Sequence, residues 1–255
     1  MIIDTHIHLC DAMYDADRGE MLKRAKNAGV NKLINVGADM DENRRICEFS
    51  EVCTDGIYAS IGLHPHYAGE FNDAVYREIK ELADRCKCIK AVGEIGLDYY
   101  KNETPKEIQA GVFEHMLLLA KEKNLPVAIH SREAYDDAYA ILKQHGPGKK
   151  GVLHCFGMDY DTAKKYIDLG YALGIGGVVT FKNAPVLKDA VRKIPLEHIV
   201  LETDAPYLAP QAHRGKRNEP SYLQYVVAEI AALKNIMPQE VERVTTENAE
   251  RLFII

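Results

Sequence analysis

Short runs rich in Ile, Val and Leu recur along this chain, and the intervals between most of them are long enough for a helix. Eight such runs stand at Ile2–His6, Lys32–Val36, Tyr58–Ile61, Lys90–Gly93, Val127–His130, Val152–His154, Tyr171–Ile175 and Ile199–Glu202. Glycine or polar residues bound them, as is typical of strands in a parallel sheet that is buried on both faces. The pattern therefore predicts eight parallel strands.

Amphipathic segments fill the intervals between these runs. Lys106–Lys123 repeats apolar residues with a period of 3.6, Asn124 closes it, and Pro126 opens the next strand. We expect further helices at Arg18–Ala28, Glu133–Lys143, Asp161–Leu169, Pro185–Val191 and Tyr222–Leu233. Alternation of strands with helices in 255 residues favours an α/β fold, a closed (β/α)8 TIM barrel, over an open doubly wound sheet. We expect one domain over residues 1–255, with an extra outer helix at the C-terminal end, from Pro238 onward.

Composition narrows the class of protein and its partners. No apolar run approaches the roughly 18 residues that span a bilayer, and the N-terminal MIIDTHIHLC lacks a signal-peptide pattern. We therefore expect a cytoplasmic protein without membrane contact. The net charge of −6 means that a polyanionic substrate would need both metal ions and a local basic loop to hold it. Six cysteines without a Cys-x-x-Cys pair are expected to be reduced thiols: Cys10, Cys47, Cys53, Cys86, Cys88 and Cys155.

Histidines and carboxylates stand at the ends of the predicted strands, and a barrel gathers these ends on one face. The residues are His6, His8, Glu94, His130, His154 and Asp204, with His64 after the third strand and Glu202 beside Asp204. Singly, each could be a hydrogen-bonded structural residue or a cap. Together they indicate a site for Zn²⁺, Mn²⁺ or a related ion. His6 and His8 point the same way in a strand, and Glu94 is central enough to bridge two ions.

The blocks around these residues resemble the TatD-like metal-dependent deoxyribonucleases. The matching blocks are Asp4–His8, Gly62–His66, Gly93–Tyr100, Pro126–Arg132, His154–Gly157, Leu201–Leu208, Arg214–Pro220 and Asn248–Phe253. Their order and separation are specific to this family, whereas His-x-His alone also occurs in other amidohydrolase-like barrels. Many of those barrels bridge their metals with a carboxylated lysine, so Glu94 fits the nuclease branch better.

The resemblance implies a TIM barrel of the metallo-dependent hydrolase type with two divalent ions per chain, Mg²⁺, Mn²⁺ or Zn²⁺. It assigns one ion to His6, His8, Glu94 and Asp204, and the other to Glu94, His130 and His154. It also implies a deoxyribonuclease that hydrolyses DNA phosphodiesters through a water activated by two metals, in the manner of a 3′–5′ exonuclease. The expected partner is DNA with single strands or frayed ends, without an obligate protein partner.

The expected two-metal mechanism gives individual residues specific roles. Asp204 is the candidate general base, and Glu202 would orient a ligand imidazole. His64 would contact the phosphate or assist the leaving oxygen, although its ring could instead pack in its loop. Arg214, Lys216 and Arg217 form a basic loop for DNA, or else pair with acids such as Glu219. Tyr99, Tyr100 and Tyr207 could stack on bases or pack at the barrel rim.

Two other functions remain open from the residues alone. The same two-metal site could hydrolyse another ester or amide, such as the aminoacyl ester of a charged tRNA, in a deacylase. A barrel that only binds a ligand is the other alternative, and the six intact ligand positions argue against it.

Overall fold

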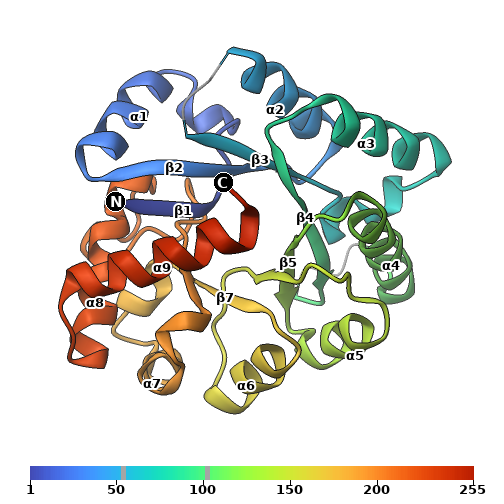
Figure 1. The fold of residues 1–255 in the computed structure, drawn as a ribbon. Coiled ribbons are helices and arrows are strands. Elements are labelled where there is room, and N and C mark those ends of the chain that lie inside the picture. The colour runs from blue at the N-terminus through green and yellow to red at the C-terminus, as the bar shows by residue number, and fades with distance from the viewer. Residues whose placement is uncertain (53–55, 101–103) are drawn as a thin grey trace. The chain divides into compact units, whose positions relative to one another are not determined.

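In the part of the chain that the structure describes, eight parallel strands follow one another and form a single sheet. Figure 1 shows the strands with the helices that lie around them. The computed structural model describes residues 1–52, 56–100 and 104–255. The order of the strands in the sheet is their order along the chain, and a helix follows each of them. The fold is therefore the predicted (β/α)8 barrel. The chain divides into two compact units, residues 1–35 with 154–255, and residues 36–153. A single domain over residues 1–255 stays a prediction.

The first unit contains both ends of the chain. Its strands are β1 (Ile2–Ile7), β2 (Val30–Val36), β7 (Ala172–Ile175) and β8 (Ile199–Leu201), and its helices are α1 (Arg18–Asn27), α6 (Tyr160–Asp168), α7 (Pro185–Lys193), α8 (Leu223–Lys234) and α9 (Pro238–Phe253). β1 pairs with β2, and β7 pairs with β8. The red helix α9 is the expected extra helix and lies beside blue β1 (Figure 1), with which it is in contact. Asn248 on α9 donates to the carbonyls of Leu196 and Ile199, so α9 covers the amino end of β8.

The second unit is built around β4. Its strands are β3 (Ile57–Ile61), β4 (Ile89–Asp98), β5 (Val127–Arg132) and β6 (Gly151–Leu153), and its helices are α2 (Met40–Val52), α3 (Asp73–Arg85), α4 (Lys106–Lys123) and α5 (Tyr135–His145). β4 pairs with β3 on one side and with β5 on the other. It continues to Asp98, whereas the prediction ended it at Gly93. Helices α2 and α3 were not among the predicted helices.

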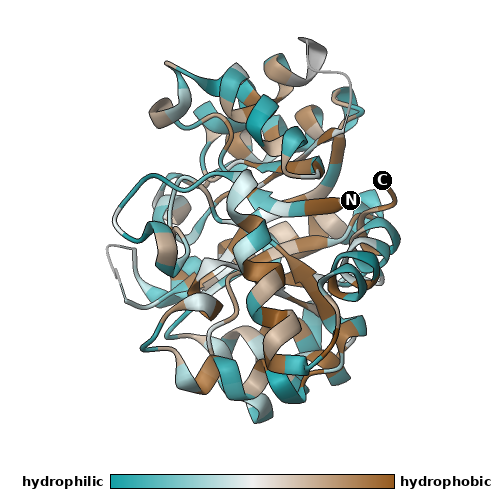
Figure 2. Cartoon of the chain, turned by 90° about the vertical axis from the view of Figure 1, so that its left-hand side faces the viewer, coloured by the Kyte–Doolittle hydropathy of each residue, from teal (hydrophilic) through white to brown (hydrophobic). Residues whose placement is uncertain are grey.

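The colours of Figure 2 follow the expected division of hydrophobic and polar residues. The strands are largely brown, and the helices carry both brown and teal, as amphipathic helices that cover a sheet should. Every residue of β1 is buried, which fits a strand covered on both faces. Within the described ranges, no helix combines the length and the apolar character needed to cross a membrane.

Helix ends coincide with residues that suit them. Asn124 adopts a left-handed φ of 52° after α4, and Gly170 does so at 91° after α6. Asn124 was expected at the end of α4, and Gly170 directly follows the predicted helix Asp161–Leu169. Asparagine and glycine tolerate the left-handed region best. Asp159 caps α6 by accepting a hydrogen bond from the backbone N–H of Thr162 at 2.8 Å.

The cysteines depart from the prediction of reduced thiols. Cys47 on α2 and Cys86 after α3 form a disulfide, with Cα atoms 5.8 Å apart. The packing of α2 against α3 brings together residues that are 39 positions apart. No short-range spacing signals such a pair, which is why it could not be found in the sequence. Cys10, Cys88 and Cys155 are thiols, and Cys53 lies outside the described residues.

Ion pairs connect α1 to the loop before α8 in the first unit. The guanidinium of Arg24 contacts both carboxylate oxygens of Glu219 at 2.7–3.1 Å. Glu219 is 6% exposed. Burial raises the pKa of Glu219, but hydrogen bonds from Arg24 and Ser221 outweigh burial and hold it below its usual value. The pair therefore stabilises the fold only while Glu219 is ionised.

This pair predicts a pH-dependent loss of stability in Arg24→Ala. At neutral pH the variant leaves Glu219 without its guanidinium, and we expect a loss on the order of 2 kcal/mol, since Arg24 is partly exposed. A carboxyl group with a lowered pKa contributes stability above its unfolded pKa and loses it as pH falls through the folded value. The difference from wild type should therefore shrink below about pH 4. Urea unfolding at several pH values measures it, with Lys23→Ala as the exposed control.

Candidate metal centre

The backbone brings the end of β1 against the segment that follows β8. The N–H of Asp204 donates to the carbonyl of His6 at 2.9 Å, and the N–H of His8 donates to the carbonyl of Ala205 at 2.9 Å. An isolated parallel bridge joins Ile7 to Ala205. Asp204, which is about 200 positions from His6 and His8 in the chain, therefore becomes their neighbour through main-chain hydrogen bonds.

A buried carboxylate reinforces this junction. Asp4 accepts hydrogen bonds from the N–H and the hydroxyl of Thr203, at 3.0 and 2.6 Å, and from the N–H of His6 at 3.2 Å. Asp4 is fully buried, and burial raises its pKa to about 7 despite these hydrogen bonds. Asp4 therefore ties the residue before Asp204 to the strand that carries His6.

Three imidazoles surround one carboxylate in the group that we call the β1/β8 cluster, formed by His6, His8, His154 and Asp204. The Nε2 atoms of His6, His8 and His154 lie 3.9, 3.6 and 3.7 Å from Oδ1 of Asp204. These separations exceed hydrogen-bond length, yet one ion could bond to such atoms at about 2.1 Å each. Burial raises the pKa of Asp204, but the imidazoles of His154, His8 and His6 outweigh it and hold that pKa below its ordinary value.

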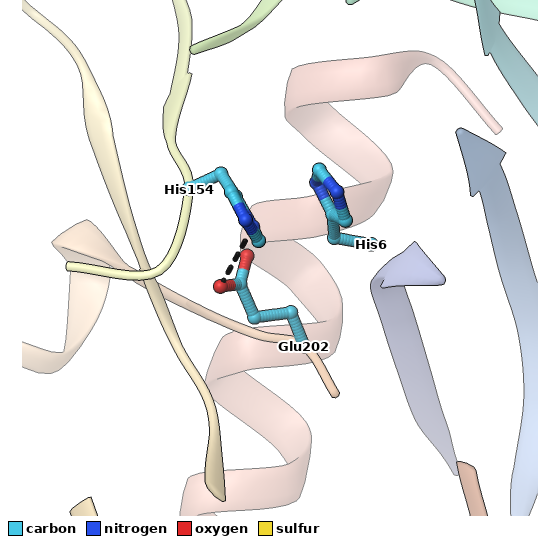
Figure 3. Close-up of side chains that lie close together, drawn as sticks. All are labelled: His6, His154 and Glu202. Atoms are coloured by element: carbon cyan, nitrogen blue, oxygen red, sulfur yellow. Dashed lines mark ion pairs between the residues drawn. The ribbon is translucent and has the colours of Figure 1, made fainter. Parts of the chain in front are cut away.

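Glu202 lies beneath His154 in Figure 3, where the ring of His6 runs nearly parallel to that of His154. Oε1 of Glu202 is 3.0 Å from Nδ1 of His154 and accepts the N–H of Cys155 at 2.6 Å. The two rings are stacked, with centroids 3.5 Å apart. A hydrogen on Nδ1 of His154 leaves the lone pair on Nε2, which faces Asp204. The contact between Glu202 and Nδ1 of His154 is an ion pair rather than a hydrogen bond, so the orienting role of Glu202 stays a prediction.

A second group, the β4/β5 cluster, contains His64, Glu94, Asp98 and His130. Oε1 of Glu94 lies 2.8 Å from Nδ1 of His130 and 3.7 Å from Nε2 of His64. In the sheet, His130 is paired with Gly96, which lies between Glu94 and Asp98. A Cβ at Gly96 would come within 2.0 Å of the carbonyl oxygen of His130. The glycine therefore allows β5 to approach closely enough for these groups to meet.

The hydrogen bonds of His64 define which of its nitrogens is a donor. Nδ1 of His64 accepts the backbone N–H of His66 at 3.2 Å, so a neutral ring carries its hydrogen on Nε2. That N–H faces Glu94. His64 is buried at the start of a 3₁₀ turn, Pro65–Glu70, and its Nε2 is therefore a hydrogen-bond donor at this cluster. Sequence reasoning could not separate this arrangement from simple packing in the loop.

Both clusters offer the chemistry of a divalent-cation site. In the described part of the chain, groups of ligand atoms within 4.8 Å of one another include His6 with His8 and Asp204, and His64 with Glu94 and His130. Imidazole and carboxylate donors of this kind suit Zn²⁺ and Mn²⁺. The residues therefore fit a metal. His154 joins the β1/β8 cluster through Asp204, and its predicted sharing of an ion with Glu94 and His130 stays a prediction.

The basic loop contains Arg214, Lys216 and Arg217. One of these cations forms an ion pair, and the other two are exposed. Arg217 contacts Asp17 at 2.6 and 2.8 Å and donates to the carbonyl of Met13 at 2.7 Å. Its guanidinium is thus engaged within the protein, as the alternative reading of this loop allowed, although with Asp17 rather than Glu219. Arg214 and Lys216 are exposed, and Arg214 also lies over the ring of Phe181.

Clusters of imidazoles and carboxylates at the ends of strands in a (β/α)8 barrel define the class of metal-dependent barrel hydrolases. Comparison with known proteins gives the particular family. A family model described as TatD related DNase matches residues 3–254. The chain is 44% identical to the uncharacterized metal-dependent hydrolase YabD of Bacillus subtilis, over the full length of both proteins. It therefore belongs to the TatD family of metal-dependent hydrolases and is an enzyme that acts on ester bonds.

Two other relatives extend the comparison. The 3′-5′ ssDNA/RNA exonuclease TatD of Rahnella is 34% identical, with 98% of this chain and 97% of the relative covered. The crystal structure of YjjV, a TatD homologue of Escherichia coli, superposes with a TM-score of 0.95 at 32% identity and covers 100% of this chain and 98% of YjjV. The TIM-barrel fold and the family that the sequence predicted are thus confirmed.

The contact between Gly174 and Glu202 yields a test of the β1/β8 cluster. A Cβ at Gly174 on β7 would lie 2.1 Å from Oε2 of Glu202, which is fully buried and has little room to move. Gly174→Ala should displace Glu202 and release His154. Because groups that orient metal ligands typically contribute 10- to 100-fold to affinity, we expect a loss of at least about tenfold for Zn²⁺. Gly19→Ala on α1, where the added Cβ meets nothing within 4 Å, is the control. Unchanged affinity in Gly174→Ala would contradict the role of Glu202.

Proposed function

We propose that this hydrolase is a divalent-metal-dependent deoxyribonuclease that removes nucleotides from single strands or frayed ends of DNA in the 3′–5′ direction. The observation that carries the proposal is the β1/β8 cluster, in which three imidazole nitrogens lie 3.6–3.9 Å from one carboxylate oxygen beside an exposed tyrosine. The name of the Rahnella relative, a 3′-5′ ssDNA/RNA exonuclease, supports the same substrate class.

Two divalent ions per chain form part of the proposal. The β1/β8 cluster would hold one ion, and Glu94 with His130 would provide ligands to the other. Glu94 as a ligand of both ions remains the prediction made from the sequence. Mg²⁺, Mn²⁺ and Zn²⁺ are the candidates, because imidazole and carboxylate sites accept each of them in proteins. A divalent ion held there would lower the pKa of a water molecule and neutralise charge on the phosphoryl oxygens.

The protein's own groups supply the remaining chemistry. Asp204 has a lowered pKa and is therefore ionised at neutral pH, so its carboxylate can accept a proton from the attacking water. His64 presents Nε2–H as a donor, and that hydrogen bond can hold a phosphoryl oxygen or the leaving oxygen. Glu202 keeps His154 in the orientation that turns Nε2 toward Asp204.

A nucleic-acid strand also needs contacts away from the reacting phosphate. The ring of Tyr207 is 50% exposed, and its centroid lies 5.9 Å from that of His8. An exposed aromatic ring at this distance from the β1/β8 cluster can stack on a base whatever the sequence of the strand. Arg214 and Lys216 are exposed cations that can attract phosphates, whereas Arg217 already binds Asp17.

A cleavage assay tests the proposal. The protein is stripped of metal, reloaded separately with Mg²⁺, Mn²⁺ or Zn²⁺, and incubated with end-labelled single- and double-stranded DNA. We expect metal-dependent release of single nucleotides, faster from a single strand than from a blunt duplex. His130→Ala, purified identically, should lower the rate by at least about 10²-fold if His130 holds an ion. Equal cleavage by both preparations would reveal a contaminating nuclease.

A negative result in this assay would point to another substrate. If the reloaded protein binds ions but leaves every DNA substrate intact, the nuclease proposal is wrong. Another ester then becomes the substrate to test, beginning with an aminoacyl-tRNA, whose deacylation could be followed with the same reloaded protein and the same His130→Ala control.

A further inference from the structure

Asp98 is a buried carboxylate at the end of β4 that no role described so far uses. It is 1% exposed. Its Oδ2 atom lies 3.0 Å from Nε2 of His66 and 3.1 Å from Nε2 of His130. One carboxylate oxygen therefore contacts two imidazoles, and one of these imidazoles belongs to the β4/β5 cluster.

His130 lies between two carboxylates that differ in their position on β4. Its Nδ1 atom is 2.8 Å from Glu94, and its Nε2 atom is 3.1 Å from Asp98. Both contacts are with carboxylates, which accept hydrogen bonds when ionised, so the position of the ring hydrogen depends on what else binds the imidazole. A divalent ion beside Glu94 would take the lone pair of Nδ1. The hydrogen of the neutral ring would then stand on Nε2, where Asp98 accepts it.

Asp98 itself is held from several directions. Oδ1 accepts the N–H of Tyr100 at 2.9 Å. The side-chain amide of Gln109 on α4 accepts the N–H of Asp98 at 2.9 Å and donates to its carbonyl at 3.1 Å. Gln109 is buried and also donates to the carbonyl of Thr104 at 2.8 Å. Tyr100 thus holds the carboxylate of Asp98 and Gln109 holds its main chain, as is expected of a group that orients another side chain.

We propose that Asp98 is a positioning residue that keeps the hydrogen of His130 on Nε2, so that Nδ1 of His130 is the atom that binds the ion beside Glu94. This inference rests on the proposed function only in assuming that the β4/β5 cluster binds a divalent ion. It assigns His66 to the same carboxylate, as a second donor to Asp98 rather than as a metal ligand.

Nitrogen NMR of the wild-type protein loaded with Zn²⁺ tests the assignment directly. In protein labelled with ¹⁵N in histidine, the signals of His130 are identified by their absence from the spectrum of His130→Gln. We expect Nε2 of His130 to show a one-bond coupling to hydrogen and Nδ1 to show none. A hydrogen on Nδ1, with Nε2 bound to Zn²⁺, would overturn the proposal without requiring any variant at Asp98.

The variant Asp98→Asn provides a second test of the proposal. The side-chain amide of asparagine has one accepting oxygen, whereas the carboxylate has two. The variant therefore loses the hydrogen bond from the N–H of Tyr100 or the one from the N–H of His130. We expect Zn²⁺ to bind the β4/β5 cluster about 10- to 100-fold more weakly, as measured by calorimetry. Asp137→Asn makes the same chemical change at an exposed carboxylate, which accepts a hydrogen bond from the hydroxyl of Tyr99, and the affinity of this variant should stay within about twofold of wild type.

The outcomes separate this inference from the proposed function. Weakened Zn²⁺ binding in Asp98→Asn, together with a hydrogen on Nε2 in the wild type, supports the role of Asp98 even if no DNA is cleaved. Conversely, a wild-type protein that cleaves DNA, with a folded Asp98→Asn variant that binds Zn²⁺ as tightly as wild type, would refute the positioning role and leave the nuclease intact.

Discussion

The attraction between the Asp204 carboxylate and the three imidazoles around it is the interaction on which the site depends. A carboxylate so nearly buried would ordinarily have a raised pKa, and it stays ionised because His154, His8 and His6 are close. Main-chain hydrogen bonds between the end of β1 and the segment after β8 create this proximity. Asp4 secures that junction, and Gly174 leaves the space that Glu202 needs beneath His154. The surrounding structure therefore serves to hold four side chains whose mutual spacing suits a cation.

The two clusters share one arrangement of imidazoles and carboxylates. In each, one nitrogen of an imidazole contacts a carboxylate behind it, and the other nitrogen faces a carboxylate in front. Glu202 stands behind His154 in the β1/β8 cluster, and Asp98 stands behind His130 in the β4/β5 cluster. With an ion bound on the front side, such pairing would keep the hydrogen on the nitrogen that faces the carboxylate behind the ring and leave the opposite nitrogen to the metal. The repetition of this arrangement in both clusters is the strongest structural argument that both are built for ions.

Much of this arrangement could be predicted from the sequence, and the exceptions have physical causes. The alternation of apolar runs and amphipathic segments predicted the barrel, because the spacing of apolar residues along a strand or helix follows from which of its faces are buried. The strand ends carrying His6, His8 and Asp204 were predicted for the same reason. Asp98 was missed because Gly93 and Glu94 looked like the end of a strand, whereas β4 continues to Asp98 and Gly96 allows close pairing with His130. The Cys47–Cys86 disulfide and the pairing of Arg217 with Asp17 depend on contacts between distant segments, which no local pattern records.

The central claim is that each cluster holds its own divalent ion, and counting bound ions tests it most directly. Wild type, Asp204→Asn and His130→Gln would be saturated with Mn²⁺, freed of excess ion by dialysis, and analysed for Mn²⁺ per chain by mass spectrometry. The account predicts two ions in the wild type and one in each variant, because each substitution removes a ligand from one cluster. A single ion in the wild type, or two ions retained in both variants, would contradict it.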